Sequence, residues 1–446
     1  MKRLHLMFVL FVVSVLLVNL FPAAAQDAPI TVTDSLGNAV VIEDASRIVT
    51  IGGAVTEVVF ALGAGDRVIA VDDSSLYPAA ALERESIGYL RFLTAEPILA
   101  LEPTLIITTE DVGPAEVVQQ LEDSGIAFLR VPAEDTVEGA AEKIRTIAAA
   151  LDEADQGEAL VETMLADIET AAALVAEAES APRVMFLFLR GAAVLTVSGT
   201  GTGADEMIRL AGAENAVTDY EGYQPLTAEA VAAAAPDVIL TTTNGLESVG
   251  GLEGLLELPG IALTPAAENG RIYATMDDLE LLGFTPRLGR AVLKLTYQLH
   301  EELVPPIGLA LEIDGRFTTF LQGVAIGRQE GTLNGDGPLT VFIPTDEAFA
   351  TLPEGTVESL YSSAISVGFV FTNHYVQGQV LTADDLRAMV GETLQPMFFG
   401  NTLNISTNEA GDLVIDDVAT VIDTIEAANG IIHVINAPMI PERPGR

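Results

Sequence analysis

The sequence contains no cysteine, and only three of its 446 residues are lysine. The absence of cysteine excludes disulfides, thiol catalysis, thiolate metal sites and attachment through a lipidated N-terminal cysteine. Positive charge is scarce, because 21 Lys and Arg stand against 64 Asp and Glu and give a formal net charge of −43. Such a chain repels polyanions and lacks a basic surface, so binding to nucleic acid is excluded.

The composition indicates folded domains. Hydrophobic residues make up 49% of the chain and charged residues 19%, which argues against intrinsic disorder. A chain of 446 residues has room for two or three domains, each large enough to bury its own core.

The first 25 residues are typical of a cleavable secretory signal. Lys2 and Arg3 precede an apolar run from Leu6 to Phe21, and small residues end at Ala25. We expect cleavage near Ala25 and a periplasmic, secreted or envelope location, with an uncleaved anchor as the alternative. Cleavage removes two positive charges and takes the net charge from −43 to −45. No later apolar run approaches the roughly 20 residues that span a bilayer.

From Arg47 to Leu303, Val- and Ile-rich strand patterns alternate with helical ones, which predicts parallel α/β units. The stretch Val137–Ser180 is rich in Ala, Glu and Leu and holds only two glycines, so it predicts one long helix, with a break allowed near Gln156-Gly157.

An internal repeat flanks that helix. Leu93-Thr94-Ala95-Glu96 recurs as Leu226-Thr227-Ala228-Glu229, and a proline and a strand ending in Thr-Thr follow each copy at the same offset of 133 residues. We therefore predict two Rossmann-like α/β lobes joined by a long helix, with a ligand cleft between them. Lobe one extends to about residue 136, the linking helix over about 137–180 and lobe two over about 181–303.

Consecutive prolines at Pro305-Pro306 end this pattern. We assign 26–303 to the two-lobed domain, 304–308 to a linker and 309–446 to a separate α+β domain.

The lobes resemble the haem-binding solute-binding proteins of bacterial ABC importers, in the class whose lobes are joined by one long helix. The resemblance covers about residues 43–303 and is carried by Gly88-Tyr89-Leu90-Arg91, the following Leu-Thr-Ala-Glu, and Glu110-Asp111-Val112-Gly113-Pro114. It implies haem as the transported ligand, Tyr89 as an axial iron ligand, and an ABC permease and ATPase as partners.

The chemistry of Tyr89 suits this role. A phenolate is a hard anionic donor for ferric haem iron, but a pKa near 10 means that ionisation needs the metal or a nearby cation. In an extended segment residues i and i+2 project to the same side, so Arg91 is expected beside the phenol. The alternative is that Tyr89 is a loop aromatic packed on the lobe.

Haem propionates require local arginines in so acidic a protein. Arg287 matches a family position near the cleft, and Arg190 follows the strand Val184–Leu189, where an arginine is usually only solvated. Tyr223, within one residue of the repeat equivalent of Tyr89, could face the haem from lobe two or be an ordinary loop tyrosine. Ligation by histidine is disfavoured because His300, near the end of the last helix, is the one histidine in the lobes.

The repeated carboxylates Glu96 and Glu229 each follow a threonine by two residues, where they complement a helix dipole. That role suffices to explain them, but the resemblance also implies that they dock onto the permease. The loop Ser198–Gly203 lacks the Gly-Lys-Ser/Thr ending of a phosphate-binding loop and is interpreted as a flexible edge of the cleft.

Residues 309–441 resemble a fasciclin domain through Thr340–Phe349, Asn373-His374-Tyr375 and Asn429–Ile435. This resemblance implies adhesion or tethering to a protein or matrix partner. His374 and His433 are interpreted as buried structural residues rather than metal ligands, because His433 lies in an apolar strand.

No Ser-His-Asp set and no cluster of His and carboxylates with metal-ligand spacing is present in the sequence, so an enzyme is not expected. The leading hypothesis is a haem receptor of an ABC importer with a fasciclin domain for adhesion or tethering. Two alternatives remain open: cobalamin or a ferric siderophore as cargo, and a fasciclin-type adhesion protein in which the lobes are a degenerate platform.

Overall fold

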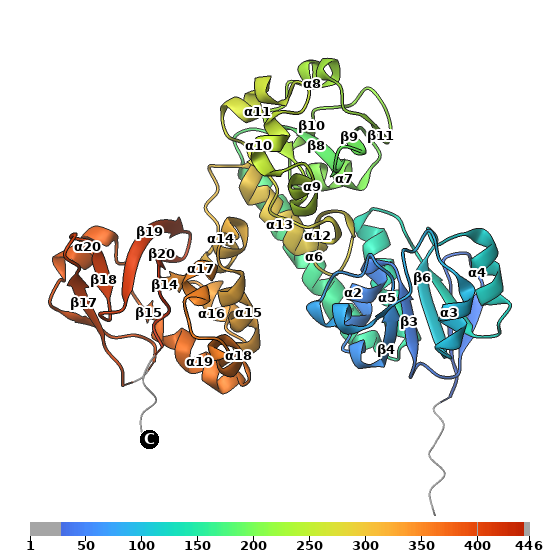
Figure 1. Cartoon of the computed structure of the whole chain (residues 1–446), viewed down its shortest axis with the longest axis horizontal. Coiled ribbons are helices and arrows are strands. Elements are labelled where there is room, and N and C mark those ends of the chain that lie inside the picture. Colours follow the sequence, from blue (N-terminus) through green and yellow to red (C-terminus); the bar gives the residue numbers. More distant parts are fainter. Residues whose placement is uncertain (1–27, 399, 441–446) are drawn as a thin grey trace, which may run out of the picture. The chain divides into compact units, whose positions relative to one another are not determined.

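The structure is a computed structural model, and it describes residues 28–398 and 400–440. The predicted signal at 1–25 lies outside the described residues. The chain divides into two compact units, Met1–Ala133 with Glu142–Glu158, and Glu134–Ala141 with Ala159–Arg446. Figure 1 colours the chain from the first unit in blue to the C-terminal domain in red.

The first unit contains the parallel sheet predicted for lobe one. Its strand order is β5-β4-β3-β6-β7, and every neighbouring pair is parallel. The central strand β3 is fully buried, as expected of a strand covered on both faces. The elements are β1 (Ile30–Thr33), β2 (Ala39–Ile42), β3 (Ile48–Ile51), α2 (Gly53–Ala61), η1 (Gly65–Arg67), β4 (Val68–Val71), η2 (Ala79–Glu83), β5 (Glu85–Ser86), α3 (Ala95–Ala100), β6 (Leu105–Thr109), α4 (Ala115–Glu122) and β7 (Ala127–Val131).

The predicted long helix is a pair of helices, α5 (Val137–Ala150) and α6 (Ala154–Glu177). The break falls at 151–153 rather than at Gln156-Gly157. Asp152 has a φ of 61°, which a continuing helix does not allow. Gly157 lies inside α6, and a Cβ there would stand 2.4 Å from the Ala148 Cβ, so the glycine permits close packing of the two helices.

Lobe two is the predicted α/β lobe, but its sheet is mixed, so the parallel pairing expected there holds only for some of its strands. The strand order is β11-β9-β8-β12-β13, with β10 beside β8, and the β8–β9 and β9–β11 pairs are antiparallel. Only three residues separate β8 from β9, which is too short for a parallel crossover. The elements are β8 (Arg183–Arg190), β9 (Val194–Ser198), α7 (Gly203–Leu210), β10 (Glu214–Asn215), β11 (Tyr223–Pro225), α8 (Ala228–Ala234), β12 (Val238–Leu240), α9 (Thr243–Ser248), α10 (Gly251–Leu256), η3 (Ile261–Leu263), α11 (Pro265–Glu268), β13 (Ile272–Tyr273), α12 (Asp278–Leu282) and α13 (Leu288–Leu299).

The C-terminal domain is a seven-stranded sheet with helices, in the order β15-β14-β20-β19-β18-β17-β16. Strand β14 contributes side chains to a hydrophobic core on each face of the sheet. Val341 and Ile343 belong to one core and Phe342 to the other. The elements are α14 (Ile307–Asp314), α15 (Thr318–Gly327), α16 (Glu330–Leu333), β14 (Leu339–Pro344), α17 (Asp346–Ala350), α18 (Thr356–Tyr361), α19 (Ala364–Asn373), β15 (Tyr375–Gln377), α20 (Ala383–Ala388), β16 (Thr393–Leu394), β17 (Leu403–Thr407), β18 (Leu413–Ile415), β19 (Ala419–Ala427) and β20 (Gly430–Ile435).

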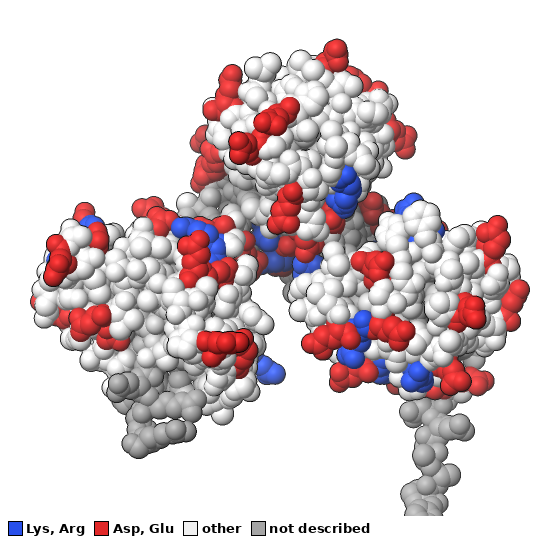
Figure 2. Space-filling view, in the orientation of Figure 1, with Lys and Arg blue, Asp and Glu red and all other residues white. Residues whose placement is uncertain are grey.

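Acidic side chains are scattered over the face drawn in Figure 2, whereas basic ones are few. Within residues 28–398 and 400–440, no helix combines the length and the apolar character needed to cross a membrane. On so acidic a surface, any arginine placed beside an aromatic ring is a candidate contact for an anionic ligand.

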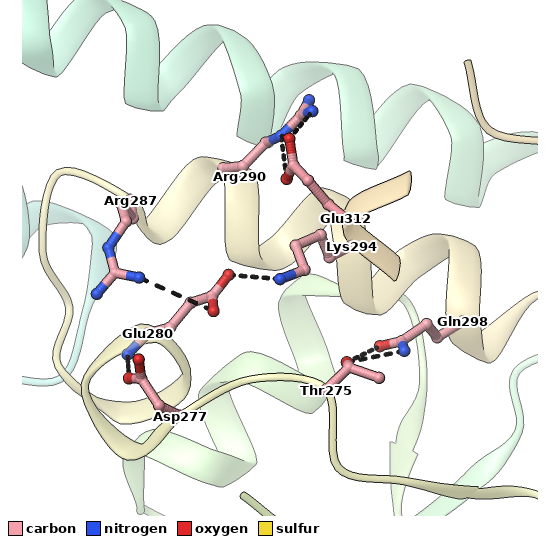
Figure 3. A network of polar contacts seen from close by, with 8 residues as sticks. All are labelled: Thr275, Asp277, Glu280, Arg287, Arg290, Lys294, Gln298 and Glu312. Carbon is pink, nitrogen blue, oxygen red and sulfur yellow. Dashed lines mark hydrogen bonds and ion pairs between the residues drawn. The ribbon is translucent and has the colours of Figure 1, made fainter. Parts of the chain in front are cut away.

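An ion pair between Arg290 and Glu312 joins lobe two to the C-terminal domain within the second unit (Figure 3). The Arg290 guanidinium of α13 donates from Nε to Glu312 Oε2 at 2.9 Å and from Nη2 to Oε1 at 2.5 Å. The forked geometry matches a carboxylate and makes this a strong type of side-chain hydrogen bond.

Candidate functional site

The Gly-Tyr-x-Arg element lies at the carboxyl edge of the lobe-one sheet, directly after β5. The Asp73 amide, after β4, donates to the Gly88 carbonyl at 3.0 Å, and the Gly113 amide, after β6, donates to the Leu90 carbonyl at 2.9 Å. Gly88 has a φ of 87°, which favours glycine. Ligands of open α/β sheets bind outside the carboxyl ends of the strands, so this edge is the place where a ligand site is expected.

Tyr89 is 43% exposed and is not packed into the lobe as a core aromatic. Its ring centroid lies 6.0 Å from that of Phe92, which is 79% exposed. Sequence reasoning missed Phe92, although an aromatic directly after the motif was a visible signal. The two rings give lobe one an exposed aromatic surface beside the phenol oxygen.

Arg91 does not stand in an extended segment, so the reason given for placing it beside the phenol is wrong. The Phe92 amide donates to the Tyr89 carbonyl at 2.8 Å and closes a turn, in which residues i and i+2 do not project together. The Arg91 Nη2 instead lies 3.7 Å from Asp111 Oδ2, and both side chains are well exposed. A pair this exposed is weak and leaves the guanidinium able to take another partner.

Lobe two carries a second aromatic and arginine group, assembled from β8 and β11. The ring centroids of Tyr223 and Phe188 are 5.8 Å apart, and the Arg190 guanidinium lies 4.4 Å from the Phe188 centroid. Burial raises the pKa of Tyr223, with hydrogen bonds to Thr202 and Ser198 acting in the opposite sense. Phe188 was also missed; it stands between the two residues that the sequence did single out.

Arg190 is held in place rather than merely solvated. Its Nη2 lies 2.8 Å from Asp278 Oδ2, and its Nη1 donates to the Leu189 carbonyl at 2.8 Å. Stacking on Phe188 adds a cation–π contact. The arginine at the end of β8 therefore presents a fixed guanidinium.

Arg287, at the start of α13, belongs to a charge network drawn in Figure 3. Its Nη1 lies 3.8 Å from Glu280 Oε2, whereas the Lys294 Nζ lies 2.7 Å from Glu280 Oε1. The Glu280 amide is capped by Asp277 Oδ1 at 2.7 Å. The lysine thus neutralises Glu280 more closely than Arg287 does.

Glu96 and Glu229 occupy the same exposed place in the two lobes. Each lies in the first turn of a short helix, α3 and α8, after a threonine at the N-cap. Thr227 accepts a hydrogen bond from the Ala230 amide at 3.1 Å, whereas Thr94 makes no such side-chain bond. Their position fits the helix-dipole role, and their exposure leaves both carboxylates accessible to a partner.

Three backbone amides of the Ser198–Gly203 loop donate hydrogen bonds to other groups of the protein. The Gly199 amide donates to the Gly222 carbonyl at 2.8 Å, the Thr200 amide to the Tyr220 carbonyl at 2.9 Å and the Gly201 amide to Asp205 Oδ2 at 2.9 Å. A phosphate-binding loop points these groups at the ligand. In the part of the chain that the structure describes, no group of three or more His, Asp or Glu is arranged to hold a metal ion.

The comparisons with known proteins agree with this architecture. Residues 48–279 match the periplasmic binding protein family, and residues 315–441 match the fasciclin domain. The chain therefore belongs to the periplasmic binding protein family, whose members bind solutes and are not enzymes, and it carries a C-terminal fasciclin domain.

Three similar proteins show what this chain resembles. The periplasmic heme-binding protein RhuT from Roseiflexus sp. RS-1 is 42% identical, covers 58% of this chain and 99% of its own, and has a TM-score of 0.56. An uncharacterised ABC transporter substrate-binding lipoprotein, YvrC of Bacillus subtilis, is 26% identical over 62% of this chain and 86% of its own length. A vitamin B12-binding protein of Vibrio parahaemolyticus is 25% identical over 47% of this chain and 74% of its own.

Proposed function

We propose that this protein is the extracytoplasmic substrate-binding component of an ABC importer, that it binds ferric haem through Tyr89, and that it delivers the haem to a permease and its ATPase. The observation that carries the proposal is the exposed phenol of Tyr89 at the carboxyl edge of the lobe-one sheet, beside the exposed ring of Phe92. The haem-binding RhuT, at 42% identity, supports the same cargo.

The residues proposed to hold the ligand in each lobe suit ferric haem chemically. A phenolate oxygen is a hard donor for ferric iron, and bonding to the metal itself favours the ionised form. Phe92 offers an apolar face to the porphyrin. In a protein of net charge −43, Arg190 and Arg287 are the groups suited to the propionates. The Phe188 ring contacts both Arg190 and Tyr223.

A hemin titration tests the proposal. The purified protein without its signal is expected to bind hemin saturably and to develop ferric-phenolate absorption. Competition with cyanocobalamin and with a ferric siderophore distinguishes the alternative cargoes, which the similarity to a vitamin B12-binding protein keeps open. Absence of saturable hemin binding would exclude haem as cargo.

Docking to the permease is the second part of the proposal and rests on the repeated carboxylates. Replacing Glu96 and Glu229 together by Ala is expected to lower stimulation of the reconstituted importer's ATPase about tenfold, since two charge pairs of up to about 1 kcal/mol each are lost. Hemin affinity should not change. Glu116→Ala, which removes a carboxylate from the first turn of α4, is the matched control; an equal loss in that variant would contradict docking through Glu96 and Glu229.

The fasciclin domain is proposed to tether the protein to the envelope or to a protein or matrix partner. A chain that ends before residue 309 is expected to keep its hemin affinity within about twofold and to lose retention in the envelope fraction. If the protein is instead a fasciclin-type adhesion protein, the shortened chain also loses retention, but neither the full nor the shortened chain binds hemin. Retention of the shortened chain at the level of the full chain would contradict the tethering role.

A further inference from the structure

Arg190 and Arg287, which we assign to the carboxylates of the ligand, each lie near an acidic side chain of the short helix α12. Asp278 lies 2.8 Å from Arg190, and Glu280 lies 3.8 Å from Arg287. We infer that Asp278 is an internal competitor for Arg190, and that a carboxylate of the ligand must displace it to bind. The inference rests on the proposed function, because it concerns how an acidic ligand reaches lobe two.

The position of the Arg190 guanidinium does not depend on Asp278. Stacking on Phe188 at 4.4 Å and the bond from Nη1 to the Leu189 carbonyl at 2.8 Å orient it from its own strand. The guanidinium side chain is 40% exposed, and its Nη2 faces Asp278. Exchange of one carboxylate for another at Nη2 therefore leaves the arginine in place.

Asp278 is poorly satisfied for a carboxylate that is largely covered. Its Oδ2 forms the ion pair with Arg190 Nη2 and accepts a hydrogen bond from the Asn244 side-chain amide at 3.2 Å. Oδ1 is buried and has no hydrogen-bond partner among the described residues. A buried carboxylate oxygen without a donor is unfavourable, so the contact with Arg190 is weaker than a forked pair would be.

Glu280 differs in this respect. Its Oε1 accepts from the Lys294 Nζ at 2.7 Å, and that lysine side chain is only 7% exposed. If Arg287 moves to a ligand, Glu280 keeps its closer partner, and no lone buried charge results. The competition is therefore specific to Asp278.

Asp278 lies where the carboxylate of a flat acidic ligand would approach Arg190. Arg190 stacks on Phe188, whose other neighbour is the exposed ring of Tyr223. A flat ligand lying against these rings brings a carboxylate to the guanidinium edge that Asp278 contacts. The same face serves an ester of that ligand without any displacement of Asp278, because an ester carries no charge to exchange.

Titration with hemin and with hemin dimethyl ester tests the inference. Asp278→Asn is expected to bind hemin two- to fivefold more tightly than the parent chain, the effect typical of a partly exposed ion pair, and to bind the ester unchanged. Arg190→Gln should weaken binding of hemin but not of the ester, and should abolish the gain when combined with Asp278→Asn. Glu253→Gln, an exposed carboxylate of α10, controls for the change in net charge.

Three results would overturn the inference. They are unchanged or weaker hemin binding by Asp278→Asn, an equal gain with the dimethyl ester, and an equal gain in Glu253→Gln. Thermal unfolding of each variant verifies that it folds, and Asp278→Ser provides a second removal of the carboxylate. Failure of the parent chain to bind hemin would instead refute the proposed function, so the two failures are distinguishable.

Discussion

Tyr89→Phe is expected to bind hemin about 100-fold more weakly than the parent chain and to show no ferric-phenolate absorption. The substitution removes one oxygen and keeps the ring that contacts Phe92, so the lost affinity reports the Fe–O bond rather than stacking. A 100-fold loss corresponds to about 2.7 kcal/mol. Absorbance titration gives the affinity and the ligation state in the same experiment.

Tyr223→Phe is the matched control, because it removes the same oxygen from an aromatic pair on lobe two. Burial raises the pKa of Tyr223, so its phenolate is harder to form. We expect this variant to keep the absorption of the parent and to lose no more than about threefold in affinity. Loss of the absorption in Tyr223→Phe, with retention in Tyr89→Phe, would move the iron ligand to lobe two.

The repeat was the most informative feature of the sequence. The Thr-Ala-Glu copies begin α3 and α8, and the strands that follow become β6 and β12. Local sequence carries this information because an N-cap threonine and a buried Ile- and Leu-rich strand act within a few residues. Two of the three segments that resembled fasciclin, Thr340–Phe349 and Asn429–Ile435, likewise contribute β14 and β20, which lie side by side and parallel.

The contacts that shape the candidate site could not be predicted from local sequence. Arg190 pairs with Asp278, which is 88 positions away in the sequence, and no local pattern links the two residues. The turn at Tyr89 depends on bonds that link it to the loops after β4 and β6. Sequence reasoning therefore proposed Tyr89, Tyr223 and the arginines but not the residues that orient them, because those partners meet only through the sheets.

The histidines of the fasciclin domain are buried and hydrogen-bonded, as the apolar run around His433 predicted. His433 Nε2 lies 2.8 Å from the Leu381 carbonyl, and its Nδ1 lies 3.2 Å from the Thr424 hydroxyl. His374 Nδ1 lies 2.8 Å from the Val370 carbonyl, and its Nε2 accepts from the Met439 amide at 3.0 Å. A neutral ring satisfies each of these pairs of contacts, so both histidines are structural.

The fasciclin domain is accordingly expected to lose stability as the pH falls from about 6.5 to about 4. Burial lowers the pKa of His374 to about 4 from its usual value near 6.5, because the buried site disfavours the charged ring. A second proton, on Nε2, would also face the Met439 N–H. The unfolded chain takes up this proton at the higher pH and the folded domain does not. The unfolded state therefore binds more protons throughout this window, and the free energy of unfolding decreases by on the order of 3 kcal/mol. His433, whose pKa burial also lowers, adds to the loss.

Amide hydrogen exchange of β14 and β20 in the full chain measures this free energy at each pH, after correction for intrinsic exchange rates. His374→Gln keeps a polar side chain and removes the titration, so its domain should be less stable than the parent at pH 7 but should show a shallower loss between pH 6.5 and 5. That interval is informative because ordinary carboxylates, with pKa values near 4, stay charged across most of it. A slope equal to the parent's in His374→Gln would mean that His374 does not cause the acid sensitivity, and His433→Gln would then be the variant expected to remove it.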